Sequence, residues 1–540
     1  MLSSTISSLL ALGTLVSASP ATDPVFEASN FNVTKALLSH GVDVSKISAL
    51  HDVSKRSDNL CATACASLQF LYGESAVETK DEKAYNAFRA SYWSGNQADV
   101  SPQCIFKPSK QAHVSVAILL SRLTHCPFAA KSGGHAAFAG ASAAEGGITI
   151  SFANLKAVTL SKDKKIASIE PGNVWGDVYA RLAQSDLTVI GGRLYNIGVG
   201  GLVTGGGISY FSNLHGWACD NVESYEVVLA NGKIAKASSK DHADLYWALR
   251  GGGNNFGLVV GFNVKTYPLP GGKLWGGSRT YTEESFPALT KAVTNLVNNS
   301  PKDPKAGFWS VWAYLNKTKI ALPTLYHADP NAGDAPIWGD FNSLKPVADQ
   351  TQTQHISEWA KEEAAGSPNG LREMFYPITT KVDKEFLQFA QDYFFKAVLD
   401  IADIPGLIPT FVVQGITIPQ LKKMEQNGGN PLGLKAKEGP FFLIHMGCMW
   451  AYKTDDAVMF RWISDFIKII DAEARKRGLG NDYIYMNYAS QYQDVIAGYG
   501  STNKAKLKKI AKKYDPNGVY QRLQPGYFKL EGAPVAESSL

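Results

Sequence analysis

The sequence predicts an α+β protein of two domains, and three observations support this prediction. The chain has 540 residues, which is more than one compact core usually holds. Its first half alternates short apolar runs at strand spacing with segments whose apolar residues recur at helix spacing. From about residue 272 to residue 482 glycine motifs become rarer, and aromatic-rich strands alternate with amphipathic helices.

The first domain is predicted over residues 57–271. Its helix and strand signals follow one another along the chain, and a hairpin signal comes after them. Helix spacing groups Val116, Leu119, Leu120 and Leu123 on one face and Val174, Val178 and Leu182 on another, while residues 128–131, 148–152 and 225–230 are predicted strands. Asn231-Gly232 is a strong two-residue hairpin signal that leads into a strand at residues 233–237.

The second domain is predicted over residues 272–482, with strands at residues 309–314 and 441–452. The tail, residues 483–540, changes in character again. Its helix carries Leu507, Ile510, Ala511 and Tyr514 on one face and stops at the turn signal of residues 515–518. We therefore treat the tail as a third segment.

The N-terminus is typical of a secreted protein. Residues 1–18 contain a short apolar stretch followed by small residues, as a signal peptide does; the alternative is a frayed helix. Residues 19–56 would then be a leader or propeptide. Lys55-Arg56 is either its processing site or simply two exposed basic residues. Sequons at Asn32, Asn298 and Asn316 agree with secretion and predict a glycoprotein.

Six cysteines are present, and four of them occur early in the chain. In a secreted protein this clustering predicts disulfides among Cys61, Cys65, Cys104 and Cys126, although four cysteines allow three connectivities. A zinc site is the alternative, but the CxxxC spacing suits it poorly and no paired histidines complete it. We therefore predict no metal.

The formal charge of +5 is small for this length and does not require nucleic acid or a membrane surface as a partner. The sequence has no long basic run, and its apolar stretches are too short to cross a bilayer. We expect a monomer that binds a small molecule. No Gly-x-Ser-x-Gly elbow supports a hydrolase.

Three glycine-rich blocks carry the strongest functional signal: residues 131–135 (KSGGH), residues 191–207 and residues 250–257. Glycines allow close backbone approach to a ligand, and successive N–H groups in such turns form concavities that bind anions. None of the blocks matches the dinucleotide fingerprint or the nucleotide P-loop. Together they predict a domain that holds a large phosphate-bearing cofactor.

Five motifs occur in a characteristic order: KSGGHAAFAG, EPGNVWGDVYARL, GGRLYNIGVGGLVTGGGISYFSNLHGWACDNV, VVLANGKI and DLYWALRGGGNNFG. With the tail, they resemble the vanillyl-alcohol oxidase superfamily, which has a PCMH-type FAD-binding domain. The chain is most similar to the fungal secreted members of its berberine-bridge-enzyme-like branch. The resemblance implies a two-part FAD domain, completed by residues 483–540, and a substrate domain with an antiparallel sheet backed by helices.

The resemblance also implies how FAD is held. His135 matches the histidine that binds the flavin 8α-methyl group covalently. Where many members have a second, cysteine link, this chain has Leu194, which implies a single link. Val199 matches a position associated with oxygen access, which favours an oxidase. The implied FAD contacts are Ser132, Gly133, Gly134, Gly198, Val199, Gly200, Gly201, Gly205, Gly206 and Gly207.

Candidates for the substrate side come from two places. Tyr488 matches a position that faces substrate in relatives, where it would be a base, a hydrogen bonder or a half-buried core tyrosine. On the predicted strand of residues 441–452, His445, Trp450 and Tyr452 are candidates, and alternation would turn only one face of the strand to the substrate. His445 is either a base or a core histidine. The glutamate base of the plant enzymes has no secure counterpart.

The sequence thus predicts a secreted FAD oxidase that is mono-covalent through His135. It would oxidise a small apolar or phenolic molecule by hydride transfer to flavin N5, with O₂ as acceptor and H₂O₂ as product. One alternative is a dehydrogenase or ring-forming oxidative cyclase on the same fold. Another is a protein that keeps FAD without turnover.

Overall fold

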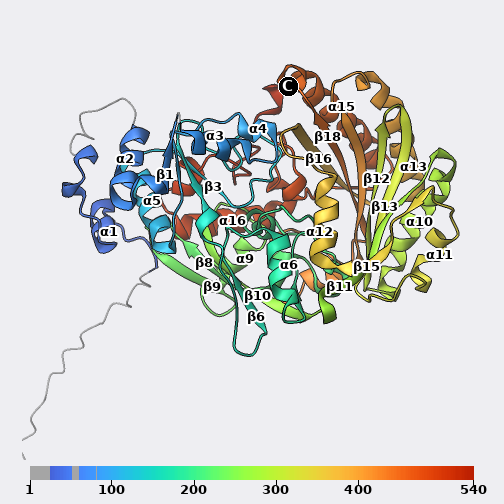
Figure 1. Cartoon of the computed structure of the whole chain (residues 1–540), viewed down its shortest axis with the longest axis horizontal. Coiled ribbons are helices and arrows are strands. Elements are labelled where there is room, and N and C mark those ends of the chain that lie inside the picture. The colour runs from blue at the N-terminus through green and yellow to red at the C-terminus, as the bar shows by residue number, and fades with distance from the viewer. Residues whose placement is uncertain (1–24, 51–59, 81, 540) are drawn as a thin grey trace, which may run out of the picture.

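The computed structural model describes residues 25–50, 60–80 and 82–539. The signal peptide prediction and Lys55-Arg56 lie outside these residues. Helices and strands are mixed throughout, with three sheets arranged from the N-terminal end of the molecule to its far side, so the α+β prediction is confirmed (Figure 1). None of the helices in the described part of the chain is long and apolar enough to cross a membrane.

The first sheet is small and mixed, in the order β1-β2-β4-β3, with β4 parallel to both of its neighbours. Its strands are β1 (Val77–Thr79), β2 (Cys104–Phe106), β3 (Phe128–Lys131) and β4 (Ile148–Ser151). Helices α1 (Val33–Ser39), α2 (Leu60–Tyr72), α3 (Lys83–Ala90) and α5 (Gln111–Thr124) lie around it, and α4 (Gly95–Ala98) lies at the boundary with the third sheet (Figure 1). Strand β3 leads directly into the glycine turn before His135, which places that turn at a sheet edge.

Two disulfides tie helix α2 to this sheet. Cys61 pairs with Cys126, just after α5, and Cys65 pairs with Cys104 in β2. The predicted disulfides among the early cysteines are therefore confirmed, and the structure selects one of the three connectivities. The remaining cysteines, Cys219 and Cys448, are buried and free.

The second sheet is antiparallel, in the order β5-β6-β10-β8-β9, with β7 also pairing with β10. Its strands are β5 (Val158–Leu160), β6 (Ile166–Ile169), β7 (Leu187–Val189), β8 (Val222–Val228), β9 (Ile234–Ser238) and β10 (Leu258–Pro268). A hairpin joins β8 to β9 at the predicted place, but only Gly232 of the pair has a positive φ, of 80°, and the Leu229 N–H donates to Lys233 O at 2.9 Å, so the loop is longer than the predicted two residues. Helices α6 (Trp175–Ala183), α7 (Val199–Thr204), α8 (Ser212–His215) and α9 (Ala243–Leu249) belong to the same stretch.

The third sheet is large and antiparallel, in the order β14-β11-β13-β12-β17-β18-β16-β19, with β15 added on β11. Its strands are β11 (Lys273–Thr280), β12 (Ala306–Leu315), β13 (Thr318–His327), β14 (Ala348–Asp349), β15 (Gln352–His355), β16 (Arg372–Lys381), β17 (Ile408–Ile416), β18 (Phe441–Trp450) and β19 (Gly480–Asn481). The helices of this stretch are α10 (Phe286–Asn299), α11 (Gly339–Asn342), α12 (Ile356–Ala365), α13 (Lys384–Ala397), α14 (Ile418–Met424) and α15 (Asp456–Lys476).

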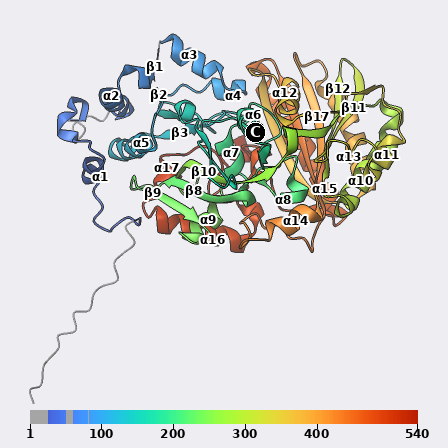
Figure 2. The same ribbon diagram turned by 60° about the horizontal axis from the view of Figure 1, so that its bottom comes forward.

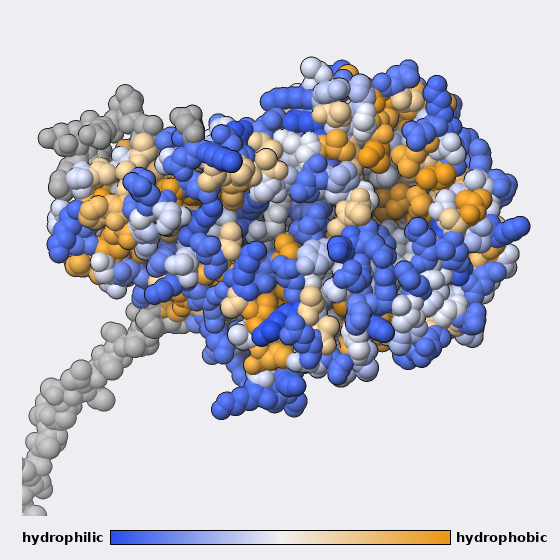
Figure 3. All heavy atoms as spheres, viewed as in Figure 1, coloured by the Kyte–Doolittle hydropathy of each residue, from blue (hydrophilic) through white to orange (hydrophobic). Residues whose placement is uncertain are grey.

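Helices α10, α13 and α15 cover one face of the large sheet, and their apolar residues form a core with that face (Figure 1). The face of the molecule in Figure 3 is largely hydrophilic, and hydrophobic residues gather on it mainly near α13 and α15. The opposite face of the sheet is turned toward the first part of the chain. These helices do not cover that face, so its side chains can line a site.

The tail returns to the first part of the chain. Helices α16 (Ser501–Tyr514) and α17 (Val519–Arg522) follow, and α16 lies against α9 (Figure 2). The helix ends at Tyr514, directly before the predicted stop signal. Hydrogen bonds fix the return: Tyr499 Oη donates to Gly251 O at 2.8 Å, and Asn255 Nδ2 donates to Phe528 O at 2.9 Å.

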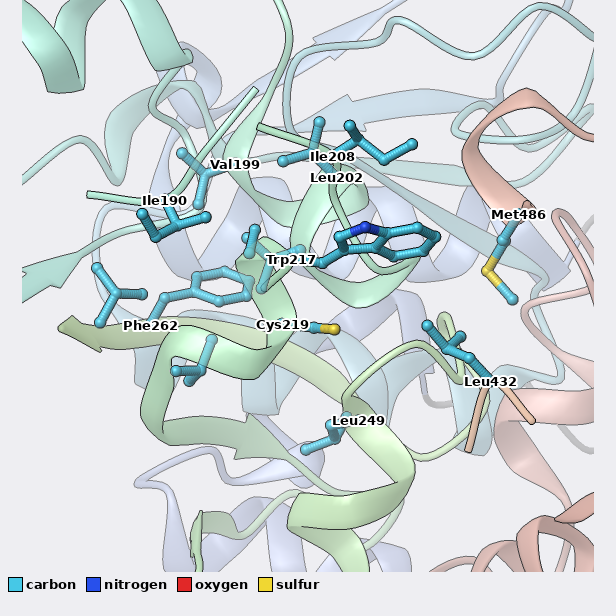
Figure 4. Packing of buried hydrophobic residues seen from close by; sticks show 14 of the residues in the cluster. Ile190, Val199, Leu202, Ile208, Trp217, Cys219, Leu249, Phe262, Leu432 and Met486 are labelled. Carbon is cyan, nitrogen blue, oxygen red and sulfur yellow. The ribbon is translucent and has the colours of Figure 1, made fainter. Parts of the chain in front are cut away.

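One hydrophobic cluster joins these parts below the glycine segments. Figure 4 shows Val199, Leu202 and Trp217 packed in it, together with Met486 from the tail. Because the cluster combines residues from distant parts of the sequence, the glycine segments lie on a rigid, close-packed base.

Candidate active site

A cavity of ≈ 660 Å³ lies between the glycine-rich segments, the open face of the large sheet and the tail. This volume is within the usual range for sites that hold small molecules and cofactors. Its wall includes Ser132, Gly133, Gly134 and His135 on one side and Tyr485, Tyr488, Gln524 and Tyr527 from the tail. The site therefore needs residues from nearly the whole length of the chain.

Two glycine segments meet in the cavity wall with bare backbone contact. A Cβ on Gly133 would lie 2.3 Å from the backbone nitrogen of Gly198, and a Cβ on Gly198 would lie 2.1 Å from that of Gly133. Ser132 joins the segments further, because its Oγ donates to Pro171 O and accepts a hydrogen bond from the Gly200 N–H at 3.1 Å. Gly134 has a φ of +71°, a backbone conformation that residues other than glycine rarely adopt.

Gly200 and Gly201 present backbone to the cavity, as predicted for cofactor contacts. A Cβ on Gly201 would meet nothing within 4 Å, so the wall is open there. Bare backbone of this kind lets a large planar or phosphate-bearing ligand approach closely. These residues therefore fit the cofactor that the sequence predicts.

Four other predicted contacts do not line the cavity. Val199 is fully buried in the core with Ile190 and Leu202, and its backbone N–H donates to Asn173 O (Figure 4). The assignment of Val199 as a direct FAD contact is corrected accordingly, and its association with oxygen access stays a prediction. Its place on the inner side of α7 explains the difference, since the helix turns Gly200 and Gly201 outward.

Gly205, Gly206 and Gly207 are the other three. Added Cβ atoms there would lie 2.1 Å from Asn487 Oδ1, 2.8 Å from Trp217 Cε3 and 2.7 Å from Ala218 Cβ, respectively. These glycines therefore permit close packing behind the cavity, and their assignment as cofactor contacts is also corrected.

His135 follows the Gly134 turn and lines the cavity. Its ring stacks on Trp93, with centroids 4.2 Å apart and an interplanar angle of 14°. Its Nε2 is buried without a hydrogen-bond partner among the described residues. Burial lowers the pKa of His135 to about 4, so the imidazole is neutral at pH 7 and keeps a free lone pair.

The open face of the large sheet forms the other wall, and its residues alternate as strand geometry requires. Odd-numbered residues of β12 and β18 and even-numbered residues of β17 face the cavity: Trp309, Val311, Ala313, Leu315, His445, Met449, Ile408, Thr410, Val412 and Gln414. One face of β18 thus lines the cavity; that the substrate lies against it stays a prediction. The wall is mainly apolar, with few polar groups.

Of the three candidates on residues 441–452, only His445 lies in the cavity wall. Trp450 points to the opposite face, where its Nε1 donates to Asp456 Oδ1 at 2.9 Å. Tyr452 lies beyond the end of β18 and is 60% exposed, so its assignment as a catalytic candidate is wrong. The strand is two residues shorter than predicted.

Tyr488 lies beside His445 and joins a polar group on the cavity wall. The two ring centroids are 4.5 Å apart. Tyr488 Oη accepts hydrogen bonds from Arg193 Nη2 at 2.8 Å and from Gln414 Nε2 at 3.3 Å. Burial, and after it the charge of Arg193, lower the pKa of His445 to about 3, so this imidazole is also neutral.

Arg193 and Glu363 line the cavity but were missed in the sequence. Arg193 is only 7% exposed, and its Cζ lies 4.6 Å from the centre of the Trp309 ring. Glu363 is on α12, and burial raises its pKa to about 7. A charged residue between Gly192 and Leu194, inside an otherwise uncharged glycine block, was the one available signal for Arg193.

The fold and the cavity define a protein that holds a large cofactor against a substrate-binding sheet, and comparisons identify that cofactor. Residues 102–238 match the FAD binding domain family. The chain is 36% identical over 505 residues to the FAD-dependent monooxygenase tpcD of Cochliobolus heterostrophus, covering 87% of this chain and 94% of that protein. It is 29% identical over 468 residues to the bifunctional solanapyrone synthase of Alternaria solani, covering 86% and 89%.

Among solved structures, berberine bridge enzyme from Eschscholzia californica matches with a TM-score of 0.71 at 17% identity, covering 84% of this chain and 97% of that one. At this identity the likeness concerns the fold. The chain belongs to the family of FAD-dependent oxidoreductases that includes these fungal relatives, and it has the fold of berberine bridge enzyme.

Proposed function

We propose that this protein is a secreted oxidase that carries FAD through a single covalent bond to His135. It oxidises a small apolar or phenolic molecule and passes the electrons to O₂, which gives H₂O₂. The observation that carries this proposal is the position of His135, a neutral imidazole with an unpartnered nitrogen in a cavity walled by glycine backbone. The bond would replace one C–H of the flavin 8α-methyl group and the imidazole N–H, with two electrons passing to oxygen.

A single link is supported by Leu194, which lines the cavity but has no sulfur with which to form a second bond. The stack of His135 on Trp93 holds the imidazole in one orientation. Trp93 in turn contacts Phe375, with ring centroids 5.4 Å apart, and Phe375 also lines the cavity. The attachment point is thus fixed relative to the sheet on which substrate would lie.

FAD, when bound, accepts a hydride equivalent from the substrate at N5. The residues of the chain must then orient the substrate and take up its proton. We assign uptake of the proton to Tyr488 Oη, because this oxygen lies in the cavity wall and accepts hydrogen bonds from Arg193 Nη2 at 2.8 Å and from Gln414 Nε2 at 3.3 Å. His445, with a pKa of about 3, is too weak a base for this role and serves as a hydrogen-bonding neighbour.

The printed names of the relatives favour a second candidate. Several are FAD-dependent monooxygenases, which place one oxygen atom of O₂ in the product, and one is a solanapyrone synthase. Turnover under ¹⁸O₂ separates the candidates. An oxidase gives one H₂O₂ per O₂ and an unlabelled product, whereas a monooxygenase gives a labelled product and needs a reductant such as NADPH. A cyclase also gives an unlabelled product, but the product contains a new ring.

The first experiment concerns the covalent bond. Purified protein is precipitated with trichloroacetic acid, and the pellet and supernatant are scanned for flavin absorbance. We expect a yellow pellet for the wild type, a colourless pellet for His135→Ala, and a yellow pellet for the control His355→Ala, which alters an exposed histidine. Yellow only in the wild-type supernatant would refute the covalent bond. No flavin in either fraction would refute the proposed function.

Secretion is tested by expressing the chain with and without residues 1–18 in a fungal host and blotting the culture medium. We expect the protein in the medium only with residues 1–18 present. N-terminal sequencing of the secreted form shows whether the chain is cut after Arg56. Treatment with an endoglycosidase reveals glycans at Asn298 and Asn316, both of which are exposed.

A further inference from the structure

The cavity wall contains a buried cation. Arg193 uses Nη2 to donate to Gln414 Oε1 at 2.6 Å and to Tyr488 Oη at 2.8 Å. Its other terminal nitrogen, Nη1, is buried and has no hydrogen-bond partner among the described residues. Arg193 is only 7% exposed, so solvent does not satisfy this N–H group. Because Arg193 lines the cavity, a molecule bound there can accept the hydrogen bond.

The groups in contact with this guanidinium are an indole ring, an amide and a phenol. Trp309 lies beneath it, Gln414 and Tyr488 are its hydrogen-bond partners, and His445 is neutral. No carboxylate in the described part of the chain forms an ion pair with Arg193. Glu363 also lines the cavity; burial raises its pKa to about 7, and the charge of Arg193 opposes that rise.

Burying a charge without a partner is costly, and buried cations in proteins are normally paired with an anion. The described residues give Arg193 two hydrogen bonds and an aromatic ring, but no ion pair. The free N–H group points to a missing negative oxygen, for which the guanidinium is the preferred donor. Most of the rest of this wall, including Val311, Leu322 and Val412, is apolar and suits a hydrocarbon body.

We propose that the substrate carries an oxygen that is ionised at neutral pH, on an apolar unsaturated framework, and that Arg193 binds this oxygen through Nη1. A carboxylate, an enolate and a phenolate share this chemistry. The inference rests on the proposed function only where it names the ligand as the substrate. Arg193 is thus a specificity-determining residue, and it excludes neutral analogues of the same shape.

The test measures binding and needs no turnover. Benzoate and benzamide have nearly the same shape, but only benzoate carries a negative oxygen. Their dissociation constants are measured by calorimetry on the purified full chain, for the wild type, Arg193→Met, Arg193→Lys and the control Arg181→Met. The control removes an exposed guanidinium from α6. The flavin content of each sample is measured separately.

We expect the wild type and Arg181→Met to bind benzoate at least tenfold more tightly than benzamide, since a hydrogen bond to a charged group is worth this factor. Arg193→Met should lose the preference, and Arg193→Lys should keep part of it. Equal affinity of the wild type for both probes would overturn the proposal, even if the variants do not fold. An unchanged preference in Arg193→Met, with only the flavin reduction potential altered, would assign Arg193 to the cofactor and also overturn it. A missing flavin would refute the proposed function. The affinities for benzoate and benzamide would still decide whether Arg193 binds a negative oxygen.

Discussion

Glu373 on β16 is a buried carboxyl group that the folded protein must keep protonated. This requirement should lower the free energy of unfolding at neutral pH. Its side chain is 1% exposed, and neither carboxyl oxygen has a hydrogen-bond partner among the described residues. Burial raises its pKa from 4.5 to about 10. The residue does not line the cavity, so Glu373→Gln changes this group without touching the site.

The size of the effect follows from proton linkage. Below pH 4.5 both the folded and the unfolded chain hold the proton, and Glu373 carries no ionisation penalty. Between that pH and about 10 only the folded state holds it, so the free energy of unfolding falls by about 1.4 kcal/mol per pH unit. At pH 7 the penalty is about 3 kcal/mol, which Glu373→Gln should remove while keeping a neutral side chain of similar shape.

Thermal unfolding at several pH values measures this difference. An unfolding entropy of about 2.1 cal/mol/K per residue means that 3 kcal/mol raises the Tm by roughly 3 °C if the whole chain unfolds cooperatively. The gain of Glu373→Gln over the wild type should disappear near pH 4.5 and grow toward pH 8.5. Glu438→Gln, at an exposed site, is the matched control. The same Tm difference at every pH would refute the reasoning.

Three further predictions concern the site and the framework. Tyr488→Phe should slow flavin reduction by substrate at least tenfold in stopped-flow experiments by removing the proton acceptor, while Tyr452→Phe should match the wild type; equal rates would reject the assignment. Gly198→Ala would place a Cβ 2.1 Å from a backbone nitrogen, so the protein should fail to retain flavin after gel filtration, and a normal flavin content would contradict that geometry. Replacing Cys65 and Cys104 together by serine opens a 39-residue loop and should lower the free energy of unfolding in urea by about 4 kcal/mol; a loss below 1 kcal/mol would show that the constraint is unimportant.

Features that depend on residues close together in the sequence could be predicted from local sequence patterns. The hairpin between β8 and β9 was predicted from Asn231-Gly232, although its loop is longer than the two residues expected. Alternation predicted that one face of β18 would be used without saying which, and the structure puts His445 on the cavity face and Trp450 on the other. Tyr452 was misplaced because the strand ends at Trp450, and strand ends depend on neighbouring elements more than on local residue type.

Non-local features were not predictable from the sequence. The resemblance implied Gly205, Gly206 and Gly207 as cofactor contacts, and the sequence alone does not distinguish glycines that face a ligand from glycines that face a packed side chain. The role of Arg193 depends on Gln414 and Tyr488, which are 221 and 295 residues away in the chain. Nothing in the local sequence indicates such partners.

The returning tail has a consequence for how the protein is made. Tyr485 Oη accepts the backbone N–H of Ile208 at 3.0 Å, and Asn487 Nδ2 donates to Leu202 O at 3.0 Å, so the tail closes the pocket beside α7. A ribosome-bound chain that has not yet reached residue 485 lacks this wall, however well its sheets have formed. Flavin capture must therefore wait until translation is nearly complete, and a nascent chain that stalls earlier would leave the ribosome as an empty apoprotein.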